Sequence, residues 1–291
     1  MNAIVQTPEI KARENIDFGL DQEIPKYWFR NDPFKTRIFD GLQITFPDGE
    51  RYFISSVRKF RDKITDAKLK QDVVQFTRQE AQHGIAHTKY NQLLESQGVP
   101  MKALLEDHKK MLESFNQRFS PEFNVALTAA FEHFTALMAN AFFGKKEVLE
   151  GTDERMKSLF AWHAIEEMEH RSVAFDVMQK VAKVGYFKRS GAMALGTYFT
   201  MATMFKMVDK LLEADGYSKR ERRILFLKNL KWMYGKKGVL SAFTPELLAY
   251  FKPNFHPENI PIMQNYSTWV DVYEDTQDPF KACVALMEMA K

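Results

Sequence analysis

Two stretches, Glu80-Ala-Gln-His83 and His163-Ala-Ile-Glu166-Glu167-Met168-Glu169-His170, decide the fold of this chain. Each contains an E-x-x-H repeat, which on a helix places a carboxylate and an imidazole less than one turn apart on the same face. Both side chains of such a pair can therefore point at one metal ion. One repeat arises easily by chance, because Glu and His are common on helices, but two in one chain predict a metal site between helices.

Two further glutamates complete the pattern. Glu132 lies between the repeats and Glu50 lies before them, each on a separate predicted helix. Two E-x-x-H repeats and a glutamate from each of two other helices form the ligand set of dinuclear iron and manganese carboxylate bundles. Buried carboxylates are costly without a partner, and two divalent ions would neutralise four of them. The sequence therefore predicts two ions, held by Glu50, Glu80, Glu132 and Glu167 together with histidines.

Histidines on the same helix faces would add nitrogen donors. At about 100° per residue, two triplets each span about 60° on a helical wheel; they are Glu80, His83, His87 and His163, Glu167, His170. His163 would supply an imidazole beyond the two of the repeats. Mixed imidazole and carboxylate ligation suits iron, manganese or zinc, whereas magnesium and calcium prefer oxygen alone.

A role other than metal binding would also account for several of these residues. The helix dipole favours a glutamate in a first turn, which would account for Glu50 without a metal. His87 lies one turn beyond His83, where it would either hydrogen-bond a ligand or merely line the pocket. Glu166 and Glu169 lie off the predicted face, although a local distortion of the helix would let either replace Glu167. His108 and His256 are expected to be structural, and His133, which points about 100° away from Glu132, is expected to be packed or exposed.

Small residues surround Glu132 on its own helix face, namely Thr128, Ala129, Thr135, Ala136 and Ala139. They would leave room for a substrate or dioxygen beside the metal centre. They would equally allow two helices to approach closely.

Start and stop signals place these residues on helices. Predicted helices follow Pro47 and run to about 60, from about 67 to 97, from 121 to about 149 and from 154 to about 184, with a short helix and turn over 101–120. The longest connection joins the second and third bundle helices, as in the ferritin-like topology. We expect an all-α, single-domain protein: an ordered N-terminal arm (1–45), a four-helix bundle with one long crossover (46–185), and a helical C-terminal extension packed on it (186–291). The tail is expected to be loop-like until a final helix from about Asp278.

Composition excludes several classes of protein. The chain has 291 residues, 45% of them hydrophobic, which is enough for a large core. A net charge of +3 is too small to indicate nucleic acid as the main partner. The single cysteine, Cys283, excludes an intrachain disulfide framework, and the N-terminal stretch lacks the apolar core of a signal peptide. These features favour the cytoplasm.

Two segments after the bundle raise the question of a membrane. Residues 190–205 carry no charge and are too few for a confident span, which favours a buried helix. Lys219 to Lys237 holds eight basic residues and one acidic residue, interleaved with apolar ones. This pattern predicts a bundle helix with a solvated face, or else peripheral contact of 190–237 with an anionic membrane.

Motifs along nearly the whole chain resemble those of a known family, the bacterial ferritin-like proteins catalogued as predicted metal-dependent hydrolases. The resemblance runs through Tyr27-Trp28, Phe46-Pro47-Asp48-Gly49-Glu50, Gln79-Glu80-Ala81-Gln82-His83 with His87, Trp162 to His170, Ser172 to Asp176, and Phe255-His256-Pro257. The run His163, Glu167, His170 also resembles the ligand motif of p-aminobenzoate N-oxygenases. The resemblance implies two irons held by Glu50, Glu80, His83, Glu132, His163, Glu167 and His170.

Two reactions fit this site. The first is activation of O2 by a non-haem di-iron centre to oxidise a small, hydrophobic substrate near Glu132, with an electron donor that the sequence does not name. The alternative is hydrolysis of an ester, amide or phosphate by a metal-bound water, with manganese or zinc as possible metals. Iron storage is a third hypothesis, which the long C-terminal extension disfavours. We also expect a homodimer.

Overall fold

The computed structural model describes residues 8–144, 146–236 and 238–288. Their regular structure is helical, apart from one isolated bridge between Phe29 and Thr152. The predicted all-α class is therefore confirmed.

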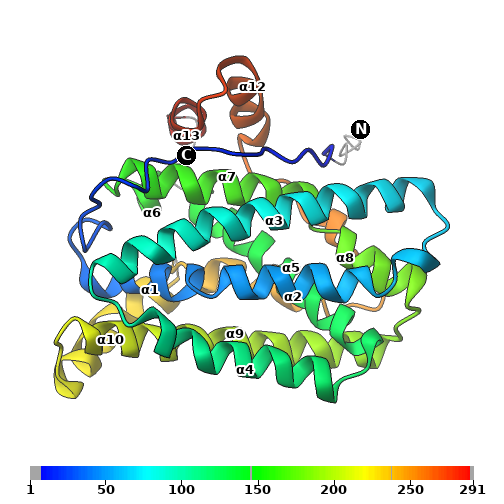
Figure 1. The fold of residues 1–291 in the computed structure, drawn as a ribbon, viewed down its shortest axis with the longest axis horizontal. Coiled ribbons are helices and arrows are strands. Elements are labelled where there is room, and N and C mark those ends of the chain that lie inside the picture. The colour runs from blue at the N-terminus through cyan, green and yellow to red at the C-terminus, as the bar shows by residue number, and fades with distance from the viewer. Residues whose placement is uncertain (1–7, 145, 237, 289–291) are drawn as a thin grey trace.

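Four helices form the central bundle (Figure 1): α2 (Phe46–Arg58), α3 (Ala67–Ser96), α5 (Pro121–Phe143) and α7 (Glu154–His170). Helix α2 packs against α3 and α5, and α7 packs against α3 and α5. The connection from α3 to α5 holds α4 (Met101–Arg118), a full helix rather than the short one expected. The bundle with one long crossover is as predicted.

Polar side chains begin these helices where the sequence indicates. The side chains of Asp66, Ser120 and Asp153 accept hydrogen bonds from backbone N–H groups in the first turns of α3, α5 and α7. Two helices end earlier than predicted. Helix α5 ends at Phe143, before the short α6 (Lys146–Leu149), and α7 ends at His170, followed by α8 (Val173–Asp176) and a π-helical turn, Val177–Val181.

The N-terminal arm contains a helix that the sequence pattern does not predict, α1 (Pro33–Gln43). Asp32 accepts a hydrogen bond from Lys35 N, and Pro33 occupies the first turn, so a start signal is present. Nearly every side chain of α1 is buried, which removes the polar face that periodicity detects. The helix packs against α9 (Tyr186–Ala214).

Helices α9 and α10 (Lys219–Tyr234) cover one side of the bundle together with α4, at the bottom of Figure 1. The apolar stretch 190–205 is helical as predicted but is not buried all round. Tyr198, within this stretch, is 65% exposed. Among the described residues, no helix is long and apolar enough to cross a membrane.

The C-terminal residues are more helical than expected. Helices α11 (Thr244–Ala249), α12 (Tyr266–Thr276) and α13 (Pro279–Glu288) follow α10, with 3-10 turns at Arg61–Lys63, Ser241–Phe243 and Pro257–Asn259 elsewhere. Helix α13 packs on α12 and on α7. In Figure 1 the extended N-terminal segment runs along α7 on the side where α12 and α13 lie.

Candidate metal centre

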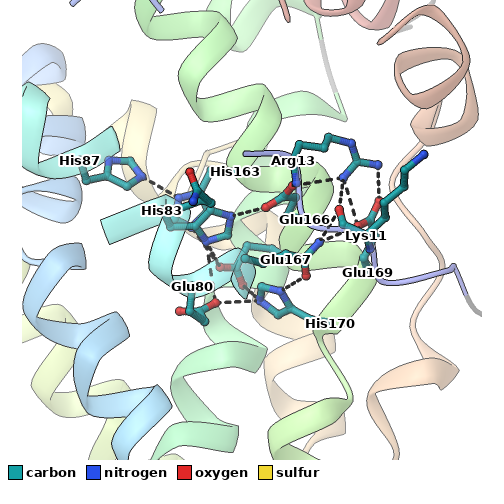
Figure 2. Close-up of polar contacts among 12 residues, drawn as sticks. Lys11, Arg13, Glu80, His83, His87, His163, Glu166, Glu167, Glu169 and His170 are labelled. Atoms are coloured by element: carbon teal, nitrogen blue, oxygen red, sulfur yellow. Dashed lines mark hydrogen bonds and ion pairs between the residues drawn. The ribbon is translucent and has the colours of Figure 1, made fainter. Parts of the chain in front are cut away.

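Seven buried side chains from α2, α3, α5 and α7 meet inside the bundle. They form two groups whose candidate ligand atoms lie within 4.8 Å of one another: Glu50, His83 and His163 in one, and Glu80, Glu132, Glu167 and His170 in the other. Figure 2 shows five of them, from α3 and α7, turned toward a common space. The structure thus brings together all seven residues that the sequence suggests as ligands.

Two carboxylates join the groups. Glu167 Oε1 lies 2.9 Å from His163 Nε2 in the first group, and its Oε2 lies 3.5 Å from His170 Nε2 in the second. Glu80 Oε1 is 3.1 Å from His170 Nε2 and 3.7 Å from His83 Nδ1. Glu80 and Glu167 therefore lie where carboxylates would bridge two ions.

Hydrogen bonds outside the cluster fix two imidazoles. His170 Nδ1 lies 2.8 Å from the side-chain oxygen of Gln79, an acceptor, so this nitrogen carries the proton. His83 Nε2 lies 3.0 Å from Glu166 Oε2 and donates to it in the same way. In the neutral form of each ring, the other nitrogen is unprotonated and faces the cluster carboxylates, which is the form that binds a metal.

His163 is fixed by a longer chain of contacts. His87 Nδ1 lies 2.8 Å from Gln43 Oε1 and donates to it, so His87 Nε2 is an acceptor. His163 Nδ1 then donates to His87 Nε2 over 2.7 Å, and His163 Nε2 lies 2.9 Å from Glu167 Oε1 on the cluster side. His87 contacts a cluster imidazole, which is the first of the two positions suggested for it.

The negative charge of the cluster carboxylates exceeds the positive charge of the groups around them. Burial, followed by the charges of neighbouring glutamates, raises the pKa of Glu50 and of Glu132 well above the usual value, and burial raises that of Glu80. Burial opposes ionisation of Glu167 too, but His170 and His163 hold its pKa well below the usual value. Burial opposes protonation of His170, but Glu167 and Glu132 raise its pKa.

Inward-facing atoms of this cluster lack hydrogen-bond partners. They include both carboxylate oxygens of Glu50, Glu132 Oε1 and His83 Nδ1. Buried polar atoms are normally paired, so these need a ligand. Four carboxylates and three imidazoles are a donor set that suits divalent iron, manganese or zinc ions.

A buried ion-pair network supports the ligands from the N-terminal arm. Arg13 donates to Glu169 and to Glu166, and Glu169 also accepts from Gln79. Burial raises the pKa of Glu166 to about 7, although Arg13 opposes this. Glu166 therefore holds Arg13 and the outer nitrogen of His83, Glu169 holds Arg13 and Gln79, and neither belongs to the two groups of candidate ligands (Figure 2). The sequence does not point to Arg13, Gln43 or Gln79 as supporting residues, because Arg13 and Gln43 lie outside the ligand motifs and Gln79, although next to Glu80, is not a candidate ligand.

A cavity of about 90 Å³ reaches the cluster at Glu50, His163 and Glu167. Its other walls come mainly from aromatic and aliphatic side chains of α1, α2, α4, α5 and α9. Thr135, one of the small residues beside Glu132, lines this cavity and donates a hydrogen bond to Glu167. Glu132 itself does not line the cavity, so a substrate position beside Glu132 stays a prediction.

Two other histidines are structural, as expected. His133 is buried against Tyr250 and Phe255, with ring centroids 5.0 and 5.1 Å away. His256 Nε2 lies 3.1 Å from Asp176 Oδ1, outside the cluster. His108 lies elsewhere, in the wall of the cavity.

Comparison with protein families gives one match, to a model described as predicted metal-dependent hydrolase, over residues 12–260. The chain belongs to this family of predicted metal-dependent hydrolases. The matched region contains the N-terminal segment with Arg13, the complete cluster and the cavity. Comparisons with curated proteins and with solved structures gave no match. The ferritin-like relationship and the likeness to N-oxygenases stay predictions.

Proposed function

We propose that this member of the predicted metal-dependent hydrolase family is a dinuclear enzyme that hydrolyses an ester or amide bond of a largely apolar substrate. The observation that carries the proposal is the buried cluster of seven candidate ligand groups, several of them without a hydrogen-bond partner, at the end of an apolar cavity. The family description favours hydrolysis over the oxidation that we expected first.

The chain's own residues have three tasks in this reaction. Bound divalent ions would polarise a carbonyl group and lower the pKa of water. Glu80 and Glu167 would hold both ions, because the carboxylate of each contacts one histidine from each of the two groups. Gln79, Glu166 and His87 keep the outer imidazole nitrogens protonated, so the inner ones stay available. The apolar walls exclude bulk water and orient the substrate toward Glu50 and Glu167.

Oxidation of a hydrophobic substrate is the second candidate. Four carboxylates with histidines in a four-helix bundle are the ligand set of di-iron proteins that activate O2. The apolar cavity at the cluster suits that chemistry as well. This reaction would need O2 and an electron donor. The predicted homodimer and the membrane contact through 190–237 also stay predictions.

One experiment separates the two candidates. Metal-free protein is titrated with Zn(II), Mn(II) and, without oxygen, Fe(II), and then assayed with uncharged p-nitrophenyl esters and, separately, with an oxygen pulse. We expect two ions per chain and ester hydrolysis that requires Zn(II) or Mn(II) but no oxygen. Oxygen uptake and a transient visible band with Fe(II), without hydrolysis by any metal form, would establish oxidation instead.

A matched pair of variants tests the site itself. Glu80→Ala removes a carboxylate that lies between the two groups, and we expect it to lower the metal content and abolish activity. Glu95→Ala, on an exposed position of the same helix, keeps both. Equal metal content in the two variants would exclude this cluster as the metal site.

A further inference from the structure

The cavity beside the cluster has an uneven distribution of polar groups. Phe46, Phe53, Phe131 and Phe134 contribute to its walls, and Phe53 and Phe131 stack with ring centroids 5.9 Å apart. The cluster side is polar because Glu50, His163 and Glu167 lie there. The wall from α4 contains one imidazole, His108, beside Met111 and Leu112.

His108 is buried without a visible reason. It is 8% exposed, and its Nδ1 has no hydrogen-bond partner among the described residues. Burial lowers the pKa of the ring to about 4, although the charge of Asp48 opposes this. The imidazole is therefore neutral near pH 7, with donor and acceptor capacity inside an apolar wall. Leaving such a group unpaired costs about 1–3 kcal/mol.

His133 provides an instructive contrast. It is also buried, and burial lowers its pKa to about 4. Its Nε2 nevertheless lies 3.4 Å from a backbone oxygen, that of Glu246, and its ring packs between Tyr250 and Phe255. These contacts account for the burial of His133 by a structural role. His108 has none of these contacts and faces the cavity instead.

We propose that His108 determines substrate specificity by forming one hydrogen bond with the single polar group of an uncharged, mostly aromatic or aliphatic substrate. This inference rests on the proposed function, because it assigns the cavity to the substrate of the metal centre. It places the substrate between His108 on α4 and the cluster on the opposite helices. It applies to hydrolysis and to oxidation alike.

The cavity also excludes a class of substrate. None of its lining residues, all of them described, is Lys or Arg. A phosphate or carboxylate in this cavity would have no lysine or arginine beside it, and its polar neighbours would be two imidazoles, four threonine hydroxyls and the cluster carboxylates. An unpaired buried anion is strongly disfavoured. Phosphate esters, which the sequence leaves open as substrates, therefore fit poorly unless their charge is held by the metals.

The test measures binding rather than turnover. Dissociation constants of 4-fluorotoluene, 4-fluorophenol and 4-fluorobenzoate for full-length, metal-loaded protein are measured by 19F NMR. We expect the phenol to bind about three- to tenfold more tightly than the toluene, as one neutral hydrogen bond allows, and the benzoate to bind most weakly. His108→Leu should remove the preference for the phenol and leave the toluene unchanged or slightly tighter. His108→Asn should restore part of it.

His133→Leu is the matched control, because it removes another buried neutral imidazole, one that lies outside the cavity. Thermal unfolding shows whether each variant is folded. A phenol preference that persists in His108→Leu would place the hydroxyl elsewhere, for example on a metal, and would overturn the inference. Failure of all three probes to bind would overturn it too. If His108→Leu removes the preference for the phenol but no metal form of the protein shows activity, the proposed function is wrong. The role of His108 in binding would then still be supported.

Discussion

Arg13 and Glu169 form a two-pronged ion pair inside the protein. Arg13 Nη2 lies 2.7 Å from Glu169 Oε1, and Arg13 Nη1 lies 3.1 Å from Glu169 Oε2. The guanidinium also lies over the ring of Trp269 on α12, 5.3 Å from its centroid. One side chain of the N-terminal arm therefore connects the helix that carries His170 to the C-terminal helices.

The first prediction concerns this connection. Arg13→Met leaves the buried carboxylates of Glu166 and Glu169 without their cation, and we expect a loss of about 3–5 kcal/mol in unfolding free energy. Because Glu166 and Gln79 orient His83 and His170, metal affinity should also fall, by about 10–100-fold. Chemical unfolding and competitive metal titration measure the two effects.

Arg78→Met is the control for that loss. Arg78 pairs with Glu14 of the same arm, but both side chains are largely or partly exposed. Exposed ion pairs contribute about 0–1 kcal/mol, so this variant should resemble the wild type in stability and metal affinity. Equal effects of the two substitutions would show that the arm, and not the buried pair, supports the cluster.

The helices and the ligand candidates could be predicted because their signals are local. Helix starts carry capping residues, and the E-x-x-H spacing acts within one turn. The supporting residues could not be predicted in this way. Arg13 is more than 150 positions from Glu169, and only tertiary packing brings them together. No periodicity marks an arm that is extended.

The helices that the sequence does not predict lack one of these local signals. Helix α1 is buried on almost every side, and α12 follows Asn265, an N-cap residue that has a left-handed backbone and makes no side-chain cap hydrogen bond. Neither helix has both an amphipathic pattern and a recognisable start. From the sequence, His108 is expected to be structural. Apolar neighbours in a sequence can indicate that a residue is buried, but they do not show whether a buried imidazole has a hydrogen-bond partner.

The second prediction tests how closely α2 and α3 approach. A Cβ atom at Gly84 of α3 would lie 3.2 Å from Glu50 Oε2. Gly84→Ala should therefore displace the Glu50 carboxylate by a few tenths of an ångström and weaken metal binding at the group that contains it. We expect the second equivalent of metal to bind less tightly, while the first is nearly unchanged, as measured by calorimetric titration.

The matched control for Gly84 is Gly191→Ala. Gly191 lies in α9, and a Cβ atom there would meet nothing within 4 Å. This variant should be neutral or slightly more stable, by up to about 1 kcal/mol, because alanine restricts the unfolded chain. An unchanged two-site titration in Gly84→Ala would mean that Glu50 is not a ligand.

The third prediction concerns protons. Burial raises the pKa values of Glu50, Glu80 and Glu132, so the metal-free protein retains protons on this cluster near neutral pH. Metal ions bind ionised carboxylates, so metal binding should release protons and should weaken as the pH falls. Calorimetry in buffers of different ionisation enthalpy measures the number released. Glu50→Gln should release fewer, and release of none from the wild type would contradict the charge-balance argument.

The fourth prediction concerns stability in acid. Burial lowers the pKa of His108 in the folded state to about 4, whereas in the unfolded chain it is about 6.5. Between these values the unfolded chain binds more protons, so the contribution of His108 to stability is present above pH 6.5 and is lost as the pH falls toward 4. From pH 6.5 to 5 the loss should reach about 2 kcal/mol at 1.36 kcal/mol per pH unit.

The difference between the wild type and His108→Asn isolates this effect, because both proteins share the metal cluster and its own acid sensitivity. Urea unfolding at pH 7 and pH 5 should show a smaller loss in the variant, since asparagine does not titrate. His256→Asn is a suitable control: His256 is partly exposed and lies beside Asp176, so its replacement removes no buried neutral imidazole. Parallel pH dependence in the wild type and His108→Asn would show that the imidazole is hydrated or paired in solution, which would also remove the basis for its role in the cavity.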